Sequence, residues 1–259
     1  MTLLADDWFG LSGRVALVTG ASSGLGRHFA EILAAAGCTV GIAARREGYL
    51  DELAQEVAAA GGRTVPLRCD VTDRASVEES VATLTREAGV PTILVNNAGM
   101  AQGASFIDTS DGDMESVFTL NQIAAWRVAQ TVCRAMIDAG EGGSVVNIAS
   151  ITGERPIGGA AAYAVSKAAV IHMTRVMAME LARHRIRVNA LAPGYFSTDM
   201  NRDFLDSEAG KTLLKRSPMR RAGEMGELDA PLLMLASDRG SFVTGAVLPV
   251  DGGHLVATL

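Results

Sequence analysis

The amino-acid sequence predicts an α/β fold, a doubly wound parallel sheet of about seven strands with helices on both faces. Apolar, β-branched runs of strand length alternate with longer helical patterns along the whole chain, as in parallel sheets joined by crossover helices. The strand candidates are nearly uniformly apolar, which is typical of strands buried on both faces. No linker, repeat or low-complexity tract interrupts the sequence, so we expect a single domain spanning residues 1–259.

Each expected strand is a short run dominated by Val, Ile, Leu, Ala or Thr. In chain order the runs are Val15–Thr19, Thr39–Ala44, Thr64–Cys69, Thr92–Asn96, Ser144–Ala149, Arg187–Ala192 and Ala246–Val250. The expected helices lie between them, at Gly26–Ala36, Tyr49–Ala60, Arg74–Glu87, Asp113–Asp138 and Ala160–His184. One stretch, residues 194–227, is irregular and follows a strand. It is either a segment that covers a substrate or a pair of ordinary surface helices.

Charge and hydropathy argue against two classes of partner. Hydrophobic residues make up 48% of the chain and charged residues 20%, which is ordinary for a soluble globular protein. The formal net charge is −6 and no Lys/Arg cluster offsets it, so we expect no nucleic-acid partner. No apolar run approaches the ~18 residues that span a bilayer, and the acidic amino end is unlike a secretory signal. We therefore expect a cytoplasmic protein with no membrane partner.

Cysteines and histidines give no sign of a metal site. The cysteines lack both metal-ligand spacing and a disulfide framework, which favours a reducing compartment; they are Cys38, Cys69 and Cys133. The histidines are scattered, and each is most simply a packing or surface residue; they are His28, His172, His184 and His254. We expect no bound metal.

A glycine-rich turn joins the first expected strand to the first expected helix. It reads Thr19-Gly20-Ala21-Ser22-Ser23-Gly24-Leu25-Gly26. The three glycines let the backbone turn tightly and approach a ligand, and the helix amino terminus offers free N–H groups to a pyrophosphate. A flexible turn would also contain glycines, but the position between this strand and this helix favours a nucleotide site.

The end of the second strand indicates which nucleotide binds. A free ribose 2′-hydroxyl is usually met there by a carboxylate, whereas this strand ends Ala43-Ala44-Arg45-Arg46. Guanidinium groups match phosphate oxygens, so the sequence favours the 2′-phosphate of NADP. NAD stays the alternative, because Glu47 is close, arginine can stack on adenine, and both arginines can simply face solvent.

A tyrosine and a lysine four residues apart predict a proton-transfer site. Tyr163 and Lys167 would share one helix face, and Ser150 closes an apolar run upstream. The ammonium can lower the phenol pKa from its usual ~10 and has donors left for a sugar hydroxyl. Taken alone, the pair fits equally a packed tyrosine beside a solvated lysine.

These motifs occur together in a known order. The chain resembles the classical short-chain dehydrogenase/reductase family along essentially its whole length, which implies a Rossmann-like fold. The matching elements are Thr19-Gly20-x-x-x-Gly24-x-Gly26, Asp70-Val71, Asn96-Asn97-Ala98-Gly99, Asn121, Ser150, Tyr163-x-x-x-Lys167, and Pro193-Gly194 followed by Thr198.

The resemblance implies a role for each site residue. Tyr163 would be the catalytic acid/base, Lys167 would lower its pKa and hold the nicotinamide ribose, and Ser150 would orient the substrate oxygen. Asn121 would anchor a water that links Lys167 to solvent. Asp70 would lie beside the adenine, and Thr198 near the nicotinamide carboxamide. The residues expected to bind the cofactor are Gly20, Ser22, Ser23, Gly24, Leu25, Gly26, Arg45, Arg46, Asp70, Val71, Asn97, Ala98, Gly99, Tyr163, Lys167, Pro193, Gly194, Phe196 and Thr198.

The implied activity is hydride transfer between NAD(P), with NADP preferred, and a carbonyl or secondary alcohol. The small-molecule substrate stays open between a 3-oxoacyl thioester on acyl carrier protein and a sugar acid or polyol. Arg183, Arg185 and Arg187 could offer a basic patch to an acidic carrier, although a solvated helix end explains them better. A non-catalytic NADP-binding redox sensor and an epimerase or dehydratase of the extended branch are the alternatives.

The resemblance also implies an oligomer. Family members are commonly tetramers, so we expect a homotetramer or homodimer in which the helices at Asp113–Asp138 and Ala160–His184 form the dimer surfaces.

Overall fold

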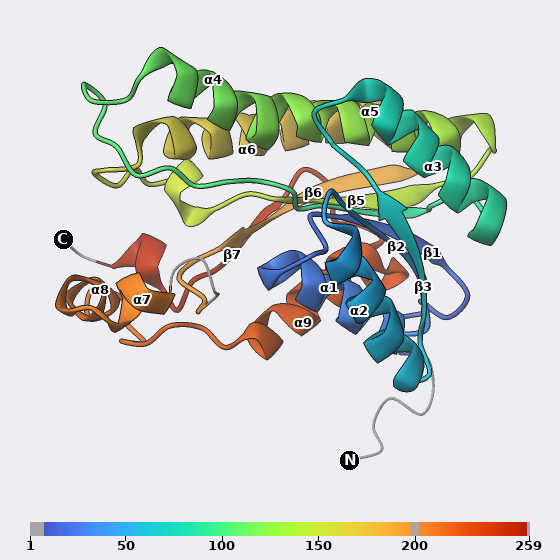
Figure 1. Ribbon diagram of the computed structural model, residues 1–259, viewed down its shortest axis with the longest axis horizontal. Coiled ribbons are helices and arrows are strands. Elements are labelled where there is room, and N and C mark those ends of the chain that lie inside the picture. Colours follow the sequence, from blue (N-terminus) through green and yellow to red (C-terminus); the bar gives the residue numbers. More distant parts are fainter. Residues whose placement is uncertain (1–7, 198–201, 258–259) are drawn as a thin grey trace.

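The computed structural model describes residues 8–197 and 202–257, which form one parallel sheet covered by helices on both faces (Figure 1). The strand order is β3-β2-β1-β4-β5-β6-β7. The strands are β1 (Val15–Thr19), β2 (Thr39–Ala44), β3 (Arg63–Arg68), β4 (Ile93–Asn96), β5 (Gly143–Ile148), β6 (Ile186–Pro193) and β7 (Val247–Val250). The predicted fold class is confirmed, and the predicted strand ends lie within one residue of the observed ones.

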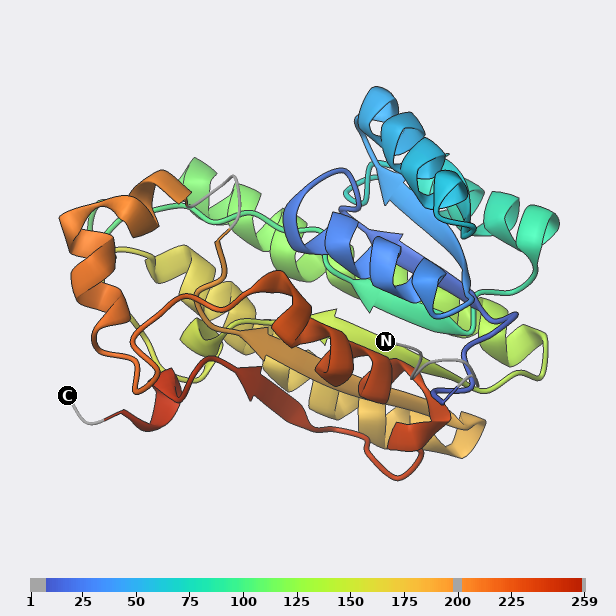
Figure 2. The same cartoon turned by 90° about the horizontal axis from the view of Figure 1, so that it is seen from below.

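The helices divide between the two faces. Helices α1, α2 and α9 cover one face, and α3, α4, α5 and α6 cover the other (Figures 1 and 2). Their bounds are α1 (Gly24–Ala35), α2 (Glu47–Ala59), α3 (Arg74–Ala88), α4 (Asp111–Phe118), α5 (Ala124–Asp138), α6 (Ala161–Leu181) and α9 (Asp229–Ala236). Two short helices, α7 (Arg202–Asp206) and α8 (Glu208–Leu214), lie beyond the carboxyl ends of the central strands (Figure 2).

The strand order reverses between β1 and β4, and this reversal positions the site. From β1 the chain builds outward through β2 to β3, then returns to β4 and builds outward the other way to β7. The connections therefore diverge above the carboxyl ends of β1 and β4, which leaves a crevice where open α/β sheets bind ligands.

The expectation that every strand is buried on both faces is wrong for the two edge strands. In β3, Val65 and Leu67 are buried while Arg63, Pro66 and Arg68 are exposed, and β7 is mostly half-buried. Each edge strand pairs on one side only, so helices cover it less completely. The inner strands β1, β2, β4, β5 and β6 are buried along almost their whole length, as predicted.

The helix predicted at Asp113–Asp138 is interrupted. It consists of α4, a π-helical turn at Thr119–Ile123, and α5. The wider turn changes the direction in which the side chains of α4 and α5 point, and such turns occur frequently at functional sites. Similarly, α6 ends at Leu181 and a 3₁₀ turn continues to His184, after which Arg185 adopts a left-handed conformation with φ of 59°.

Within residues 8–197 and 202–257, no helix combines the length and apolar character needed to cross a membrane. The same residues hold no group of three or more His, Cys, Asp or Glu side chains arranged as metal ligands. Cys38, Cys69 and Cys133 are buried and are not joined in disulfides.

Candidate active site

The turns after β1 and β4 are tied together at the crevice. The Thr19 hydroxyl accepts hydrogen bonds from the backbone N–H groups of Asn97 and Ala98, both at 3.0 Å. In return, Asn97 Nδ2 donates to the Thr19 carbonyl at 2.9 Å. The glycine turn and the predicted Asn97-Ala98-Gly99 turn therefore lie side by side, as the cofactor assignment requires.

The glycines of the first turn are needed for two different reasons. Gly20 and Gly24 have φ of +68° and +56°, in the region that L side chains avoid. Gly26 is needed for packing, because a Cβ there would overlap the Gly20 carbonyl oxygen and Asn97 Nδ2. The α1 amino terminus that follows has no side-chain cap from Ser23, so its first N–H groups can bind an anion.

Arg46 lies beside this turn. Its guanidinium donates to the hydroxyls of Ser22 and Ser23, both at 2.9 Å, and lies 4.4 Å from the centroid of the Tyr49 ring. Glu47 no longer supports NAD as the alternative cofactor, because its carboxylate pairs with Arg68 at 3.7 Å. The end of β2 therefore presents a cation and two hydroxyls, a donor set suited to a phosphate.

Arg45 points to a different neighbour. Its charge is one cause that lowers the pKa of Asp70, although the hydrogen bonds from Thr72 contribute more. The Asp70 carboxylate accepts from the Thr72 backbone N–H at 3.0 Å and from the Thr72 hydroxyl at 2.7 Å. Val71 is buried beside it. Of the two arginines, only Arg46 contacts the glycine turn.

Ser150 and Tyr163 meet at the carboxyl end of β5. Ser150 accepts hydrogen bonds from the backbone N–H and the hydroxyl of Thr152, at 3.2 and 3.0 Å, and its side chain hydrogen-bonds Tyr163. Burial raises the pKa of Tyr163, and the Ser150 hydrogen bond lowers it by less. The phenol is thus held protonated at neutral pH. Thr152, which orients Ser150, was not identified from the sequence.

Lys167 is buried on the same helix, one turn after Tyr163. Its ammonium donates to the Ile148 carbonyl at 2.8 Å and lies 5.7 Å from the centroid of the Tyr163 ring. Burial lowers its own pKa to about 8. Burial outweighs any lowering of the Tyr163 pKa in this structure, where the Lys167 ammonium donates to a backbone carbonyl, so the effect of Lys167 on that pKa stays a prediction.

Asn121 lies in the π-helical turn and is 2% exposed. Its side chain accepts from the Met100 N–H at 2.8 Å, and donates to the Met100 carbonyl at 2.9 Å and to the Ser166 hydroxyl at 3.0 Å. Ser166 in turn donates to the Tyr163 carbonyl at 2.7 Å. Asn121 therefore joins the segment after β4 to α6. Ser166, the link that completes this chain, was missed by sequence reasoning.

The side chains of Asn121 and Lys167 border the same space beside Gly99. A Cβ at Gly99 would lie 3.1 Å from Asn121 Oδ1 and 3.6 Å from Lys167 Nζ. The glycine of the turn after β4 thus leaves the space that both side chains border. That Asn121 anchors a water there stays a prediction.

The remaining predicted cofactor residues follow β6. The Gly194 N–H donates to the Val250 carbonyl at 2.8 Å, and a Cβ at Gly194 would lie 2.7 Å from Asp251 Cα, so this position also requires glycine. Phe196 is buried and forms a β-bridge with Gly223. Thr198 lies outside the described residues. A cavity of about 500 Å³ adjoins this region, lined by Tyr195, Phe196, Leu214, Met219, Arg221 and residues 249–253, among others.

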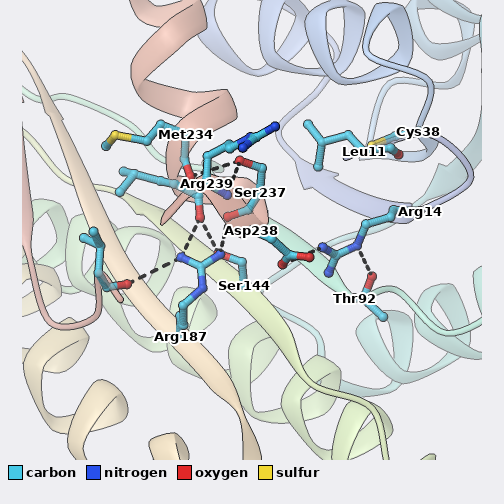
Figure 3. Close-up of polar contacts among 12 residues, drawn as sticks. Leu11, Arg14, Cys38, Thr92, Ser144, Arg187, Met234, Ser237, Asp238 and Arg239 are labelled. Atoms are coloured by element: carbon cyan, nitrogen blue, oxygen red, sulfur yellow. Dashed lines mark hydrogen bonds and ion pairs between the residues drawn. The ribbon is translucent and has the colours of Figure 1, made fainter. Parts of the chain in front are cut away.

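A second cavity, of about 610 Å³, lies at the opposite, amino end of the sheet. Figure 3 shows part of its lining. Arg187 donates to the carbonyls of Leu235, Ser237 and Val243 at 3.0, 2.9 and 3.4 Å, and Arg14 contacts Thr92 and Asp238. This end is built from polar groups that already have protein partners.

The preferred interpretation of Arg183, Arg185 and Arg187 as a solvated helix end is wrong for Arg187. Arg187 belongs to β6 and is partly buried, and it does not lie at a solvated helix end. Arg185 donates to the Gly140 carbonyl at 2.7 Å, and Arg183 contacts His184. These arginines lie at the end of the sheet away from Ser150 and Tyr163.

Comparison with known proteins gives consistent matches along the chain. A family model described as enoyl-(acyl carrier protein) reductase matches residues 20–254. A gluconate 5-dehydrogenase of Gluconobacter oxydans is 40% identical over 97% of this chain and 98% of its own length. A 3-oxoacyl-(acyl-carrier-protein) reductase of Thermotoga maritima is 38% identical over 95% of this chain and 99% of its own.

The solved structures include closely similar chains. One is a gluconate 5-dehydrogenase from Burkholderia cenocepacia in complex with NADP and tartrate, with a TM-score of 0.93 and 37% identity over 97% of this chain and 99% of that one. Another is a short-chain type dehydrogenase/reductase from Mycobacterium marinum, with a TM-score of 0.91 and 38% identity over 96% and 98% of the two chains.

Proposed function

Because the chain belongs to the short-chain dehydrogenase/reductase family, we propose that it uses Ser150, Tyr163 and Lys167 to catalyse NADP-linked interconversion of a carbonyl and a secondary alcohol. The protein is an NAD(P)-dependent oxidoreductase. The observation that carries the assignment of residues is the hydrogen-bonded pair Ser150 and Tyr163 beside the buried ammonium of Lys167, next to the crevice above β1 and β4.

In the reduction direction, Tyr163 delivers a proton to the oxygen on which charge develops, and Ser150 donates a hydrogen bond to the same oxygen. The raised pKa of Tyr163 suits this role, because the phenol carries its proton at neutral pH. Lys167 keeps a positive charge near the reacting oxygen and offers donors to the cofactor ribose. When bound, the nicotinamide cofactor supplies or accepts the hydride.

The residues fit an NADP molecule. The uncapped α1 amino terminus and the glycine turn suit the pyrophosphate, and Arg46 with the hydroxyls of Ser22 and Ser23 suits the 2′-phosphate. Three similar solved structures, described as gluconate 5-dehydrogenases and a 2-deoxy-D-gluconate 3-dehydrogenase, contain NADP. We therefore propose NADP as the preferred cofactor, with NAD as the weaker one.

Two substrate classes are supported by relatives. Gluconate 5-dehydrogenase and galactitol 2-dehydrogenase act on polyhydroxy compounds by name, and 3-oxoacyl-(acyl-carrier-protein) reductase on an acyl thioester. Arg185 and Arg187 line the cavity at the amino end of the sheet, away from Ser150 and Tyr163, so they give the second class no added support. We propose that residues 194–227, which include α7 and α8, cover the substrate within the single domain.

We further propose a homodimer or homotetramer built on α5 and α6. Ile123, Trp126, Val165 and Met179 are exposed apolar side chains in or beside these helices, 39%, 46%, 57% and 75% exposed. Light scattering should give at least twice the chain mass, and Trp126→Glu should lower it; a monomeric native protein would contradict this proposal. The buried cysteines, which are not joined in disulfides, support the proposed cytoplasmic location.

The test of the proposed function is a ketone screen that follows cofactor oxidation with NADPH and NADH separately. It should include 5-ketogluconate, a ketose and a 3-oxoacyl thioester. We expect turnover of at least one ketone, faster with NADPH, and none above background for Tyr163→Phe. Tight NADPH binding in calorimetry with no turnover of any ketone would instead favour the redox-sensor alternative.

A further inference from the structure

Two buried polar atoms near the proposed site have no hydrogen-bond partner among the described residues. They are the hydroxyl oxygen of Tyr195 and Nδ1 of His254. The His254 side chain is 8% exposed, and its ring meets the Tyr195 ring edge to face with centroids 5.4 Å apart. Buried polar groups rarely lack a hydrogen-bond partner, because nothing then replaces the hydrogen bonds they lose to water. These two atoms therefore need an explanation.

The two rings are held from several elements. The Tyr195 carbonyl accepts from the Gly223 N–H at 2.8 Å. The His254 carbonyl accepts from Arg155 Nη1 at 3.1 Å, and its N–H donates to the Asp251 carbonyl at 3.2 Å. These hydrogen bonds fix the backbone that carries both rings.

Tyr195 borders the substrate side of the site. It lines the cavity of about 500 Å³, as do Gly252 and Gly253, the two residues before His254. After burial, the Tyr163 phenol is a cause of the raised pKa of Tyr195, so the two phenols lie close enough to interact. The Tyr195 hydroxyl is thus near the oxygen that Tyr163 would protonate, and His254 adjoins it through the ring contact.

We propose that Tyr195 and His254 are positioning residues that bind a second oxygen of the substrate, a hydroxyl or carboxylate oxygen of a polyhydroxy acid. This inference rests on the proposed function and names its substrate class. An oxygen-bearing substrate can pair with both atoms, whereas an acyl chain would cover them and leave both unsatisfied. The site would therefore reject a substrate whose only polar group is the reacting carbonyl.

The surrounding charge favours an acid over a neutral polyol. Among the described residues, Arg155 and Arg216 lower the pKa of His254 electrostatically and Asp251 raises it. Arg221, which lines the cavity, pairs with Glu227 at 2.7 Å and is nearly balanced by it. Two cations against one carboxylate around the second anchor leave a positive field that attracts a substrate carboxylate.

The test measures kcat/KM with NADPH for three ketones: 5-ketogluconate, a neutral ketose, and a simple cyclic ketone without a second oxygen. We expect the native enzyme to prefer them in that order. Tyr195→Phe and His254→Phe should each lower kcat/KM for 5-ketogluconate by about 10- to 100-fold, mainly by raising KM. Each should change kcat/KM for the simple ketone by less than about threefold. His172→Phe, an exposed change away from the pair, is the matched control.

A second readout separates positioning from a structural role. Because the Tyr195 hydroxyl has no partner among the described residues, Tyr195→Phe should leave Tm unchanged or raise it. A lowered Tm with an equal loss for all three ketones would show a structural role and overturn the inference. Equal kcat/KM for 5-ketogluconate in native and variant proteins, or a native preference for the simple ketone or a 3-oxoacyl thioester, would also overturn it. If instead the native protein reduces no ketone, the proposed function itself fails.

Discussion

The two ends of the same sheet carry cavities of similar size but opposite chemistry. At the amino end, Arg187 is bound to three carbonyls, and Ser144 donates to the Leu235 carbonyl at 2.7 Å (Figure 3). At the carboxyl end, Tyr195 and His254 keep polar atoms without a protein partner, and Lys167 is buried with its pKa lowered. The larger cavity is at the amino end.

The contrast shows that cavity volume does not locate function in this molecule. Paired polar groups hold β6 to α9 and the segment before β7, and their hydrogen-bonding capacity is already used within the fold. Unpaired or desolvated groups stay available for a substrate, and such groups collect at functional sites. The amino end should therefore govern stability, and the carboxyl end should govern turnover.

The sharpest test of this division is Tyr163→Phe. Loss of one hydroxyl should lower kcat by about 10²- to 10⁴-fold, the usual contribution of a general acid. Calorimetry should find NADPH affinity unchanged, since the ring remains. Near-native kcat would show that another group delivers the proton and would place the site elsewhere.

The matching change at the amino end is Arg187→Met. It removes the charged donor from the carbonyls of Leu235 and Ser237, which keep only the Ser144 hydroxyl and the Gly240 N–H, so the free energy of unfolding should fall by about 3 kcal/mol. Urea denaturation measures this loss. The kcat/KM of the folded variant should stay within about twofold of the native value. Arg183→Met, an exposed change nearby, is the control. A large loss of kcat/KM with full stability would break the comparison.

Lys167 should destabilise the fold at neutral pH. Its pKa falls from 10.5 to about 8 on folding, so between those values the unfolded chain binds more protons than the folded one. The free energy of unfolding should therefore rise with pH across that window, by roughly a few kcal/mol. Lys167→Met should lack this rise. Urea denaturation of the native protein and of Lys167→Met at pH 7 and pH 9.5 measures the free energy of unfolding, and the difference between the two proteins isolates the contribution of Lys167. If the free energy of unfolding changes with pH equally in both proteins, Lys167 keeps its ordinary pKa.

The smallest expected effect lies at the cofactor phosphate. Arg46→Asp should reduce the NADP to NAD ratio of kcat/KM by about 10- to 100-fold, because the charge-assisted hydrogen bonds to the 2′-phosphate are lost. Arg45→Asp is the neighbouring control and should change the ratio less, since Arg45 lies toward Asp70. A larger effect from Arg45 would reverse the assignment of these two side chains.

The sequence predicted the fold class and most of the local site. Alternating apolar runs and helical patterns depend on period and length, which are local properties, so the strand bounds came out within one residue. The glycine turn, Ser150, Tyr163 and Lys167 were recognised because their order and spacing survive in the linear chain.

Three features required the tertiary structure. The π-helical turn that presents Asn121 has no periodic signal. Arg45 and Arg46 could be told apart only in the structure, where Arg46 donates to Ser22 and Ser23 and the charge of Arg45 acts on Asp70. The pKa of Tyr163 depends on burial, which the Tyr-x-x-x-Lys spacing does not encode.

Tyr195 and His254 illustrate the reason most directly. Gly194 and Phe196, which flank Tyr195, were assigned to the cofactor, but Tyr195 itself was not assigned to any ligand, and His254 was interpreted as a packing or surface residue. The pair exists because β6 and β7 are neighbours in the sheet, so the segments that follow their carboxyl ends meet. Local propensity determines which elements form, whereas long-range strand pairing determines which polar atoms are buried together and which of them lack a partner.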